Sequence, residues 1–350
     1  MNFSTKMMPM NEHAILSSYD VILSDLDGVA YRGADAAIGA VEGYQSAKNS
    51  GVRVVYMTNN SARVPAETAR QLTRLGIPTQ PEDVVTSAIT GVMLLSTLVP
   101  AGAKVLPLGA EGVRVALSEA GFLLVDSADD RPDAVLHGLN PDATWADLSE
   151  AALAIRAGAT YVATNIDATL PKERGEYLGN GSLVAAVSHA TGVVPVSSGK
   201  PEPTMYQLAL KKSGGLRPLA VGDRLNTDIL GANRAGYDSA HVLTGVTTMK
   251  QVMLAEKDER PTYPVFDLRD LTRSFEKPKV THETATVGST TVSISDHSIV
   301  INNMALGRAT VELTLNEYQA LVALAWKQVD AGHDMSWLPE FSPRWGETAE

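Results

Sequence analysis

Two aspartates, Asp25 and Asp27, follow an apolar run with a single residue between them. In an extended segment alternate side chains point to the same face, roughly 6 to 7 Å apart, so both carboxylates face one small volume. Like charges that close repel each other. The pair is therefore expected to bind a metal ion, to share a proton, or to be exposed to water.

Further polar residues stand where other apolar runs end. Thr58 follows one such run, Lys200 precedes a proline, and Asp223 follows another run, with Asp228 five residues later. Three carboxylates suit a hard Mg²⁺ ion, which prefers oxygen ligands. A lysine and a threonine hydroxyl supply donors for phosphoryl oxygens, and the lysine offsets part of the crowded negative charge. The set predicts a site for a phosphate group and a divalent cation.

Composition excludes several other classes of protein. The 350 residues include 29 basic and 40 acidic ones, for a formal net charge of −11, and no cysteine. This acidity argues against a nucleic-acid or anionic-membrane surface, so a site for an anion needs local positive charge. Without cysteine there is no disulfide, thiolate metal site or cysteine nucleophile. No stretch has a signal-peptide core or the roughly 18 apolar residues of a membrane span, so we expect a cytoplasmic protein.

The alternation of short apolar runs with helix-like stretches, from Tyr19 to about Phe266, indicates an α/β fold with a parallel sheet. In such sheets ligands bind beyond the carboxyl ends of the strands, where Asp25, Thr58 and Asp223 stand. The segment from 226 to 236 is expected to be a helix, with Asn226 or Thr227 as its cap. The expected strands are residues 21–27, 52–60, 103–109, 133–139, 160–165, 218–223 and 239–245.

The last 70 or so residues have a different pattern. Residues 284–303 alternate polar and apolar side chains with turn residues between them, which indicates antiparallel hairpins, and residues 315–332 indicate one helix. We expect a separate small α+β unit. It would provide either a self-association surface, making a homo-oligomer, or a second lobe that steadies the rest of the protein.

Four segments in the order DLDGV, TNN, GKPEP and GDRLNTD resemble the four motifs of haloacid dehalogenase (HAD)-type phosphatases, over about 250 residues from Tyr19 to Asp270. This resemblance implies a Rossmann-like core. It implies that Asp25 is the nucleophile and forms an aspartyl-phosphate, and that Asp27 protonates the leaving alkoxide and then deprotonates water. Family ATPases tend to have threonine at the second position, so Asp27 favours phosphate-ester hydrolysis or a phosphomutase.

The same resemblance assigns the remaining motif residues. Thr58, the Asn59 amide and Asn60 would hold the phosphoryl group, and Lys200 would bridge Asp25 and the phosphate. Mg²⁺ would be bound by Asp25, the main-chain carbonyl of Asp27, and Asp223, with Asp228 supporting them. Taken singly, each has a plainer interpretation. Asp228 could cap a helix, Thr58 could merely end a strand, and Lys200 could be a solvated loop residue.

About 100 residues lie between the second and third motifs, and the resemblance implies that they form a large α/β cap domain. We therefore predict a core of residues 1–85 plus 191–272, a cap of 86–190, and a C-terminal unit of 279–350. In the cap, the polar loop of residues 163–183 is expected to contact the substrate through Asn165, Asp167 and Arg174. The alternative is that this loop only connects cap and core.

Longer segments, among them residues 148–175 and 222–236, resemble actinobacterial glycerol-3-phosphate phosphatases. The expected function is therefore a Mg²⁺-dependent phosphatase for small phosphomonoesters, glycerol 3-phosphate first. The alternatives are a phosphatase for pyridoxal phosphate, nucleotides or sugar phosphates, a phosphomutase, or a phosphate-sensing module without catalysis.

Overall fold

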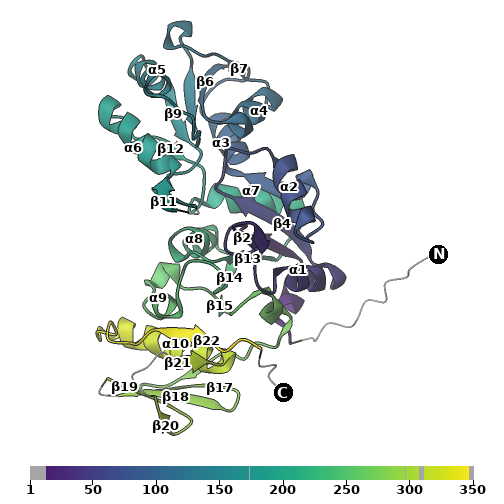
Figure 1. Cartoon of the computed structure of the whole chain (residues 1–350), viewed down its shortest axis with the longest axis vertical. Coiled ribbons are helices and arrows are strands. Elements are labelled where there is room, and N and C mark those ends of the chain that lie inside the picture. Colours follow the sequence, from purple (N-terminus) through teal and green to yellow (C-terminus); the bar gives the residue numbers. More distant parts are fainter. Residues whose placement is uncertain (1–12, 173, 296, 307–310, 347–350) are drawn as a thin grey trace, which may run out of the picture.

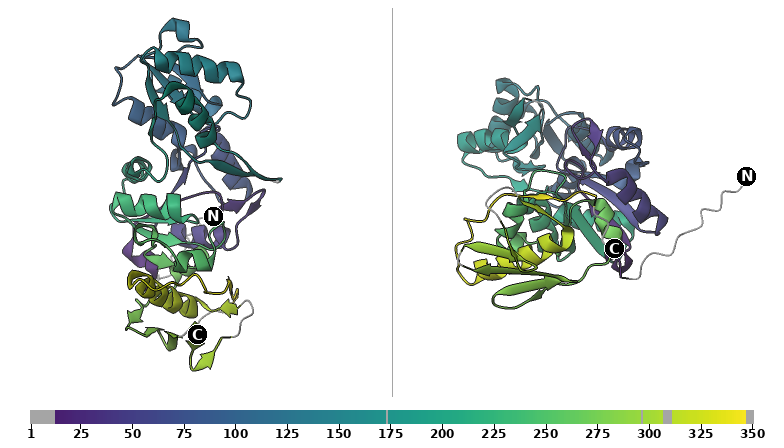
Figure 2. Two further views of the ribbon diagram at one scale, coloured as in Figure 1. Left: turned by 90° about the vertical axis from the view of Figure 1, so that its left-hand side faces the viewer. Right: turned by 60° about the horizontal axis from the view of Figure 1, so that its bottom comes forward.

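The computed structural model describes residues 13–172, 174–295, 297–306 and 311–346. These residues form three layers stacked along the long axis of the molecule, with residues from about 87 to 197 at one end and the C-terminal unit at the other (Figure 1). The same stacking is visible from two further directions in Figure 2. The predicted α/β class is confirmed.

The middle layer contains a parallel sheet that, within the described residues, has six strands. The order is β15 (Tyr263–Pro264), β14 (Asp238–His241), β13 (Pro218–Gly222), β1 (Val21–Ser24), β4 (Arg53–Thr58) and β5 (Val84–Thr86). The strand β1 is central because it pairs in parallel with both β13 and β4. Residues far apart in the chain therefore end at one edge of the sheet.

Alternate residues of these strands face opposite layers of helices, as the period of two requires. Ile22 and Val54 pack with helix α1 (Ala40–Asn49), whereas Leu23 and Val55 pack with helix α7 (Pro203–Ser213). Helices cover both faces, which explains why the strands are apolar throughout. The other helices of this layer are α2 (Pro65–Arg74), α8 (Leu230–Ala235) and α9 (Met249–Met253).

The layer at one end has its own parallel sheet between two pairs of helices. Its strands, in the described part of the chain, are β12 (Val196–Ser197), β9 (Thr160–Ala163), β8 (Ala134–His137), β6 (Lys104–Leu108) and β7 (Leu123–Leu124). One face packs on α3 (Ser87–Leu95) and α4 (Glu111–Glu119), and the other on α5 (Trp145–Arg156) and α6 (Asn180–Thr191).

The strand β12 lies outside the predicted cap boundary at residue 190. Its parallel pairing with β9 makes it part of the cap sheet, and such a short strand gives little signal in the sequence. We therefore propose that the cap extends to Ser197. The rest of the division into domains stays a prediction.

Two short hairpins extend from these layers. The hairpin β2 (Tyr31–Arg32) and β3 (Asp35–Ala36) follows the two aspartates, and the hairpin β10 (Thr169–Lys172) and β11 (Gly175–Leu178) belongs to the polar cap loop.

The C-terminal unit has the predicted antiparallel hairpins and helix. In the described residues its strands are β16 (Lys279–Val280), β17 (Thr284–Val287), β18 (Thr290–Ser295), β19 (Ser298–Ile301) and β20 (Met304–Ala305), beside a parallel pair, β21 (Val311–Leu313) and β22 (Phe341–Pro343). Helix α10 (Leu315–Asp330) packs on this sheet and on α9 of the core, so one hydrophobic core continues from one layer into the other. The Trp326 indole donates to the Val252 carbonyl at 2.7 Å across this junction.

Candidate active site

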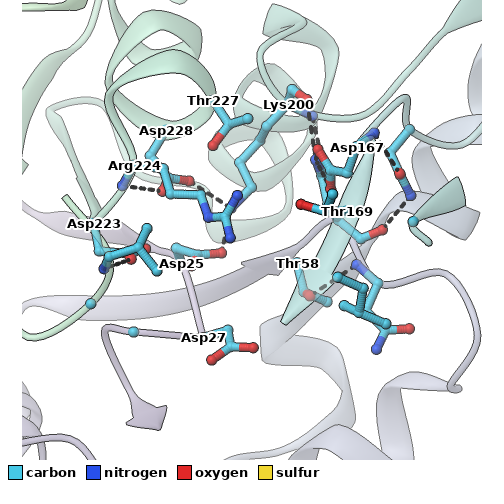
Figure 3. Close-up of a pocket in the computed structure, with 18 of the residues that line it drawn as sticks. Asp25, Asp27, Thr58, Asp167, Thr169, Lys200, Asp223, Arg224, Thr227 and Asp228 are labelled. Carbon is cyan, nitrogen blue, oxygen red and sulfur yellow. Dashed lines mark hydrogen bonds and ion pairs between the residues drawn. The ribbon is translucent and has the colours of Figure 1, made fainter. Parts of the chain in front are cut away.

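Three parallel strands deliver polar side chains to one pocket. Asp25 directly follows β1, Thr58 ends β4, and Asp223 directly follows β13, and all three line a cavity of about 680 Å³ (Figure 3). Cap residues complete the walls, among them Asn165 and Asp167. The pocket lies where the strand order predicts a ligand.

An acidic cluster forms one side of this pocket. Carboxylate oxygens of Asp25, Asp223 and Asp228 all lie within 4.8 Å of one another, and each residue is at least nine-tenths buried. The Oδ2 atom of Asp223 accepts a hydrogen bond from the Val246 amide at 2.8 Å, but its buried Oδ1 atom has no hydrogen-bond partner among the described residues. A buried carboxylate oxygen without a donor is costly, and a hard cation would satisfy it. The residues therefore fit Mg²⁺.

The cluster differs in one respect from the predicted ligand set. Asp228, which was expected to support the site from behind, contributes a carboxylate to it, whereas the Asp27 side chain does not belong to it. The ligand role of the Asp27 carbonyl stays a prediction.

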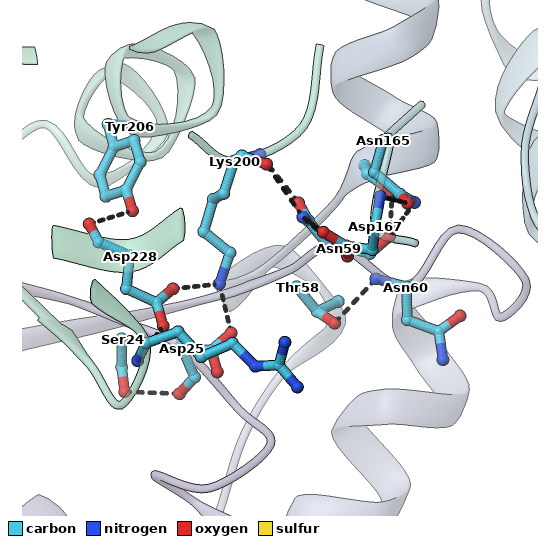
Figure 4. Close-up of polar contacts among 12 residues, drawn as sticks. Ser24, Asp25, Thr58, Asn59, Asn60, Asn165, Asp167, Lys200, Tyr206 and Asp228 are labelled. Atoms are coloured by element: carbon cyan, nitrogen blue, oxygen red, sulfur yellow. Dashed lines mark hydrogen bonds and ion pairs between the residues drawn. The ribbon is translucent and has the colours of Figure 1, made fainter. Parts of the chain in front are cut away.

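Lys200 offsets the charge of these acids. Its ammonium donates to the carboxylates of Asp25 and of Asp228, the latter at 2.7 Å, and the residue is only 3% exposed (Figure 4). Burial by itself would lower the pKa of Lys200. The negative charges of Asp228 and Asp25 have the larger effect and raise that pKa well above its usual range. Lys200 is thus a buried, charged lysine and not a solvated loop residue.

The backbone around the cluster must approach the acids closely. Gly28 has φ +86°, and a Cβ atom on it would lie 2.5 Å from the Asp223 Oδ2 atom. Only glycine combines this conformation with this proximity, so Gly28 permits the tight turn after the two aspartates.

Asp228 lies in a π-helical turn, Leu225–Ile229, that leads into α8. The prediction of Asn226 or Thr227 as the helix cap is wrong. The turn begins at Leu225, because the Asp228 Oδ2 atom itself accepts from the Arg224 amide at 3.1 Å. The Asp228 carboxylate therefore accepts hydrogen bonds both from the main-chain amide at the start of the helical turn and from the Lys200 ammonium.

Burial raises the pKa of two acids of the cluster, Asp25 and Asp223. It raises the pKa of Asp25 well above its usual range, with Lys200 opposing and Asp228 and Asp223 adding to the rise. It raises the pKa of Asp223 to about 7, again with Asp228 adding to it. Three mutually repelling, desolvated carboxylates require a compensating positive charge to ionise together.

Asp27 lies in a different environment, on the exposed side of the pocket. Desolvation of its carboxylate raises the pKa of Asp27, and the positive charges of Arg224, Arg63, Lys200 and Arg32 oppose this rise. A raised pKa suits a group that must give and take a proton. The same basic residues supply the local positive charge that an acidic protein needs to bind an anion.

The predicted phosphate-binding segment lies opposite the acids. Thr58, Asn59 and Asn60 all line the pocket, and the Thr58 hydroxyl accepts from the Asn60 amide at 3.1 Å. The side-chain amide of Asn59, however, is engaged by the main chain of Lys200 and by Asp167.

Of the three cap residues predicted to contact the substrate, two line the pocket. Asn165 and Asp167 line the pocket, so the loop that contains them does more than connect cap and core. Arg174 is exposed at the turn between β10 and β11 and is not one of the described residues that line the pocket. A contact of Arg174 with substrate stays a prediction.

The sequence analysis missed several residues of the pocket. Arg32 and Arg224 are the most informative, because Arg224 lies inside the recognised segment GDRLNTD and Arg32 follows DLDGV by three residues. Their charge beside the acids was a usable signal. The remaining missed residues that line the pocket include Tyr31, Leu139, Thr169, Leu170, Glu176, Asn180, Thr227 and Val246.

Comparison with known proteins agrees with this geometry. A family model described as haloacid dehalogenase-like hydrolase matches residues 22–123, and a second, HAD-hydrolase-like model matches residues 197–271. With the relatives described next, these matches place the chain in the family of haloacid dehalogenase-like hydrolases. Among the described residues, no helix is long and apolar enough to cross a bilayer.

Individual relatives within this hydrolase family are phosphatases by name. The chain is 45% identical over 258 residues to D-glycerol 3-phosphate phosphatase of Mycobacterium tuberculosis, covering 74% of this chain and 72% of that protein. It is 39% identical over 264 residues to the acid sugar phosphatase of Staphylococcus haemolyticus, covering 75% and 98%. These relatives confirm the predicted class of enzyme, a phosphoric monoester hydrolase.

A solved structure resembles nearly the whole chain. The crystal structure of the M. tuberculosis glycerol phosphate phosphatase in complex with magnesium matches with a TM-score of 0.80 and 38% identity, covering 90% of this chain and 92% of that one. Coverage this large necessarily extends into the C-terminal unit. The Rossmann-like HAD core, the cap and the additional unit are thus shared with that protein.

Proposed function

We propose that this protein is a Mg²⁺-dependent phosphatase that hydrolyses small phosphomonoesters, glycerol 3-phosphate first, through a phosphorylated Asp25. The observation that carries the proposal is the buried contact of the Lys200 ammonium with Asp25 and Asp228, beside Asp223 and at the bottom of a pocket. A phosphate-sensing module has no need of a proton-transferring acid, whereas Asp27 lies at this pocket with a raised pKa.

The residues account for both halves of the reaction. A carboxylate oxygen of Asp25 attacks phosphorus, the bond from phosphorus to the leaving oxygen breaks, and Asp27 gives its proton to that oxygen. In the second half Asp27 takes a proton from water while the water oxygen attacks phosphorus, and the bond between phosphorus and the Asp25 oxygen breaks, which releases phosphate and restores the Asp25 carboxylate. Lys200 and Thr58 hold the phosphoryl oxygens. A bound Mg²⁺ ion would stabilise the negative charge of the acids and of the phosphoryl group.

The pocket suits a substrate with several hydroxyl groups. Beyond the acids its lining includes Asn60, Thr169 and Glu176, which offer donors and acceptors, and the basic Arg32. Two relatives of this chain are named D-glycerol 3-phosphate phosphatase and acid sugar phosphatase. A small phosphorylated polyol therefore fits better than the ring of pyridoxal phosphate or of a nucleotide.

The test is phosphate release from glycerol 3-phosphate, pyridoxal phosphate and a nucleotide, each with and without Mg²⁺. We expect glycerol 3-phosphate to be preferred, and Asp25→Asn to lower kcat more than about 1,000-fold, because it removes the nucleophile. Asp126→Asn changes an exposed cap acid in the same way and serves as the control. Undiminished turnover by Asp25→Asn would reject the mechanism. Phosphate that stays on the substrate would instead indicate a phosphomutase.

Two further points belong to the proposal. The continuous hydrophobic core between α9 and α10 supports the C-terminal unit as a lobe that steadies the core. Self-association into a homo-oligomer and a cytoplasmic location remain predictions.

A further inference from the structure

Asn59 contacts the main chain of Lys200 at two points. The Lys200 amide donates to the Asn59 Oδ1 atom at 2.8 Å, and the Asn59 Nδ2 atom donates to the Lys200 carbonyl at 3.1 Å (Figure 4). Paired bonds of this kind fix both the position and the orientation of a backbone segment. They hold the residue whose side chain reaches Asp25 and Asp228.

The same side chain also contacts the cap. The Asn59 Nδ2 atom donates to the two carboxylate oxygens of Asp167 at 3.0 and 3.2 Å, and the Asn165 side chain donates to the Asn59 carbonyl at 2.7 Å. Asn165 and Asp167 follow the cap strand β9. A primary amide nitrogen carries two protons, which here serve the Lys200 carbonyl and the Asp167 carboxylate. One amide thus joins the core, the cap and the catalytic lysine.

The junction is closely packed. A Cβ atom on Gly199 would lie 2.5 Å from the Thr164 carbonyl oxygen and 2.8 Å from the Asn59 Oδ1 atom. The segment that returns from the cap therefore passes directly between the end of β4 and the cap loop. Asp167 is desolvated there, and burial raises its pKa while the bond from Asn59 opposes the rise.

We propose that Asn59 is a positioning residue that couples docking of the cap loop at Asp167 to the placement of Lys200. When the loop is docked, both protons of the amide are engaged and the Lys200 backbone is fixed, so its ammonium points to Asp25. When the loop leaves, Asn59 loses one partner and its amide gains freedom to rotate away from Lys200. Enclosure of the substrate and alignment of the lysine thereby occur together. The inference rests on the proposed function, because it assigns Lys200 its phosphatase role.

The first measurement is hydrogen exchange at the Lys200 amide in the full chain without substrate. Asp167→Ala leaves Lys200 and Asn59 unchanged, yet we expect exchange at this amide to rise at least about threefold, and Asn59→Ala to raise it further. Asp147→Ala removes the carboxylate half of the capping box at the start of α5, which accepts from the Thr144 amide at 2.8 Å, and is the control for general loosening of the cap domain. Unchanged exchange at Lys200 in Asp167→Ala overturns the coupling, as does an equal rise in Asp147→Ala.

The second measurement is a double-mutant cycle on kcat. A mispositioned lysine lowers kcat more than it raises KM, so we expect about a tenfold loss in Asp167→Ala and about 100-fold in Asn59→Ala. The double variant should be no slower than Asn59→Ala, since the Asp167 contact acts through Asn59. Additive losses, or an effect on KM alone, overturn the proposal. An inactive wild-type chain would reject the proposed function, while hydrogen exchange still decides the coupling.

Discussion

Substitution of Gly245 would perturb the acidic cluster without adding, removing or chemically changing any charged side chain. A Cβ atom on this glycine would lie 1.9 Å from the Asp223 Oδ2 atom and 2.3 Å from its Cγ atom, whereas ordinary contacts begin at 3.4 Å. Asp223 is 1% exposed and is held by the Val246 amide at 2.8 Å, so it has little space to yield. In Gly245→Ala the carboxylate must therefore move by about 1.5 Å, the difference between these distances.

The displacement has two expected consequences. Overpacking lowers the free energy of unfolding by about 1–3 kcal/mol. A ligand displaced by more than 1 Å should weaken Mg²⁺ binding and lower kcat/KM about 100-fold. Both are measurable, by titrating Mg²⁺ in the phosphatase assay and by following the Mg²⁺-dependent rise in Tm.

The matched control is Gly214→Ala, at the end of α7. Gly214 has φ +67° and nothing within 4 Å of its added Cβ atom, so the substitution strains the backbone by about 1 kcal/mol without approaching the pocket. Its Mg²⁺ response should equal that of the wild type. If Gly245→Ala kept the wild-type Mg²⁺ dependence and rate, Asp223 would not be a ligand at its observed position.

Two further predictions concern stability. His137 is buried in the cap and donates to or accepts from the Tyr161 hydroxyl at 2.8 Å, and burial lowers the pKa of His137 to about 3. Because the folded-state pKa lies below the ordinary 6.5, its contribution to stability is present above pH 6.5 and is lost as the pH falls toward 3, by about 1.4 kcal/mol between pH 7.5 and 5.5. The loss of unfolding free energy between pH 7.5 and 5.5 should be about 1.4 kcal/mol larger in the wild type than in His137→Asn; equal pH slopes would contradict the reasoning. Arg260 donates twice to Asp330 at 2.8 Å and joins the core to the C-terminal unit, so Arg260→Ala should cost about 1–2 kcal/mol. Arg217→Ala, which removes an exposed pair at 3.9 Å, should cost less than about 0.5 kcal/mol, and similar losses in the two variants would show that the Arg260 contact does not stabilise the junction.

Much of the site was accessible from local patterns. Asp25 and Asp223 stand directly after apolar runs, and a parallel sheet places such residues at one edge, so their convergence followed from the predicted class of sheet. The C-terminal hairpins were also predictable from the sequence, because alternation of polar and apolar residues with a period of two is a property of each strand separately.

Other features depend on how distant segments pack. The contact of Asn59 with Lys200 and Asp167 joins residues 108 and 141 positions apart, and no local pattern encodes which partner a side-chain amide will find. The two-residue strand β12 is defined by its pairing with β9, and the π-helical turn by the reach of Asp228 to the Arg224 amide.

The sequence by itself determined which chemical groups the protein brings to its reaction, the order of its motifs and the class of its sheets, since these depend on residue type and short-range periodicity. Only the tertiary structure decided that Asp228 joins the acidic cluster, that Arg32 and Arg224 surround Asp27, and that cap and core meet at Asn59. Those results depend on distances of a few ångströms between segments remote in the chain, which are fixed by packing of the whole molecule and not by any one segment of it.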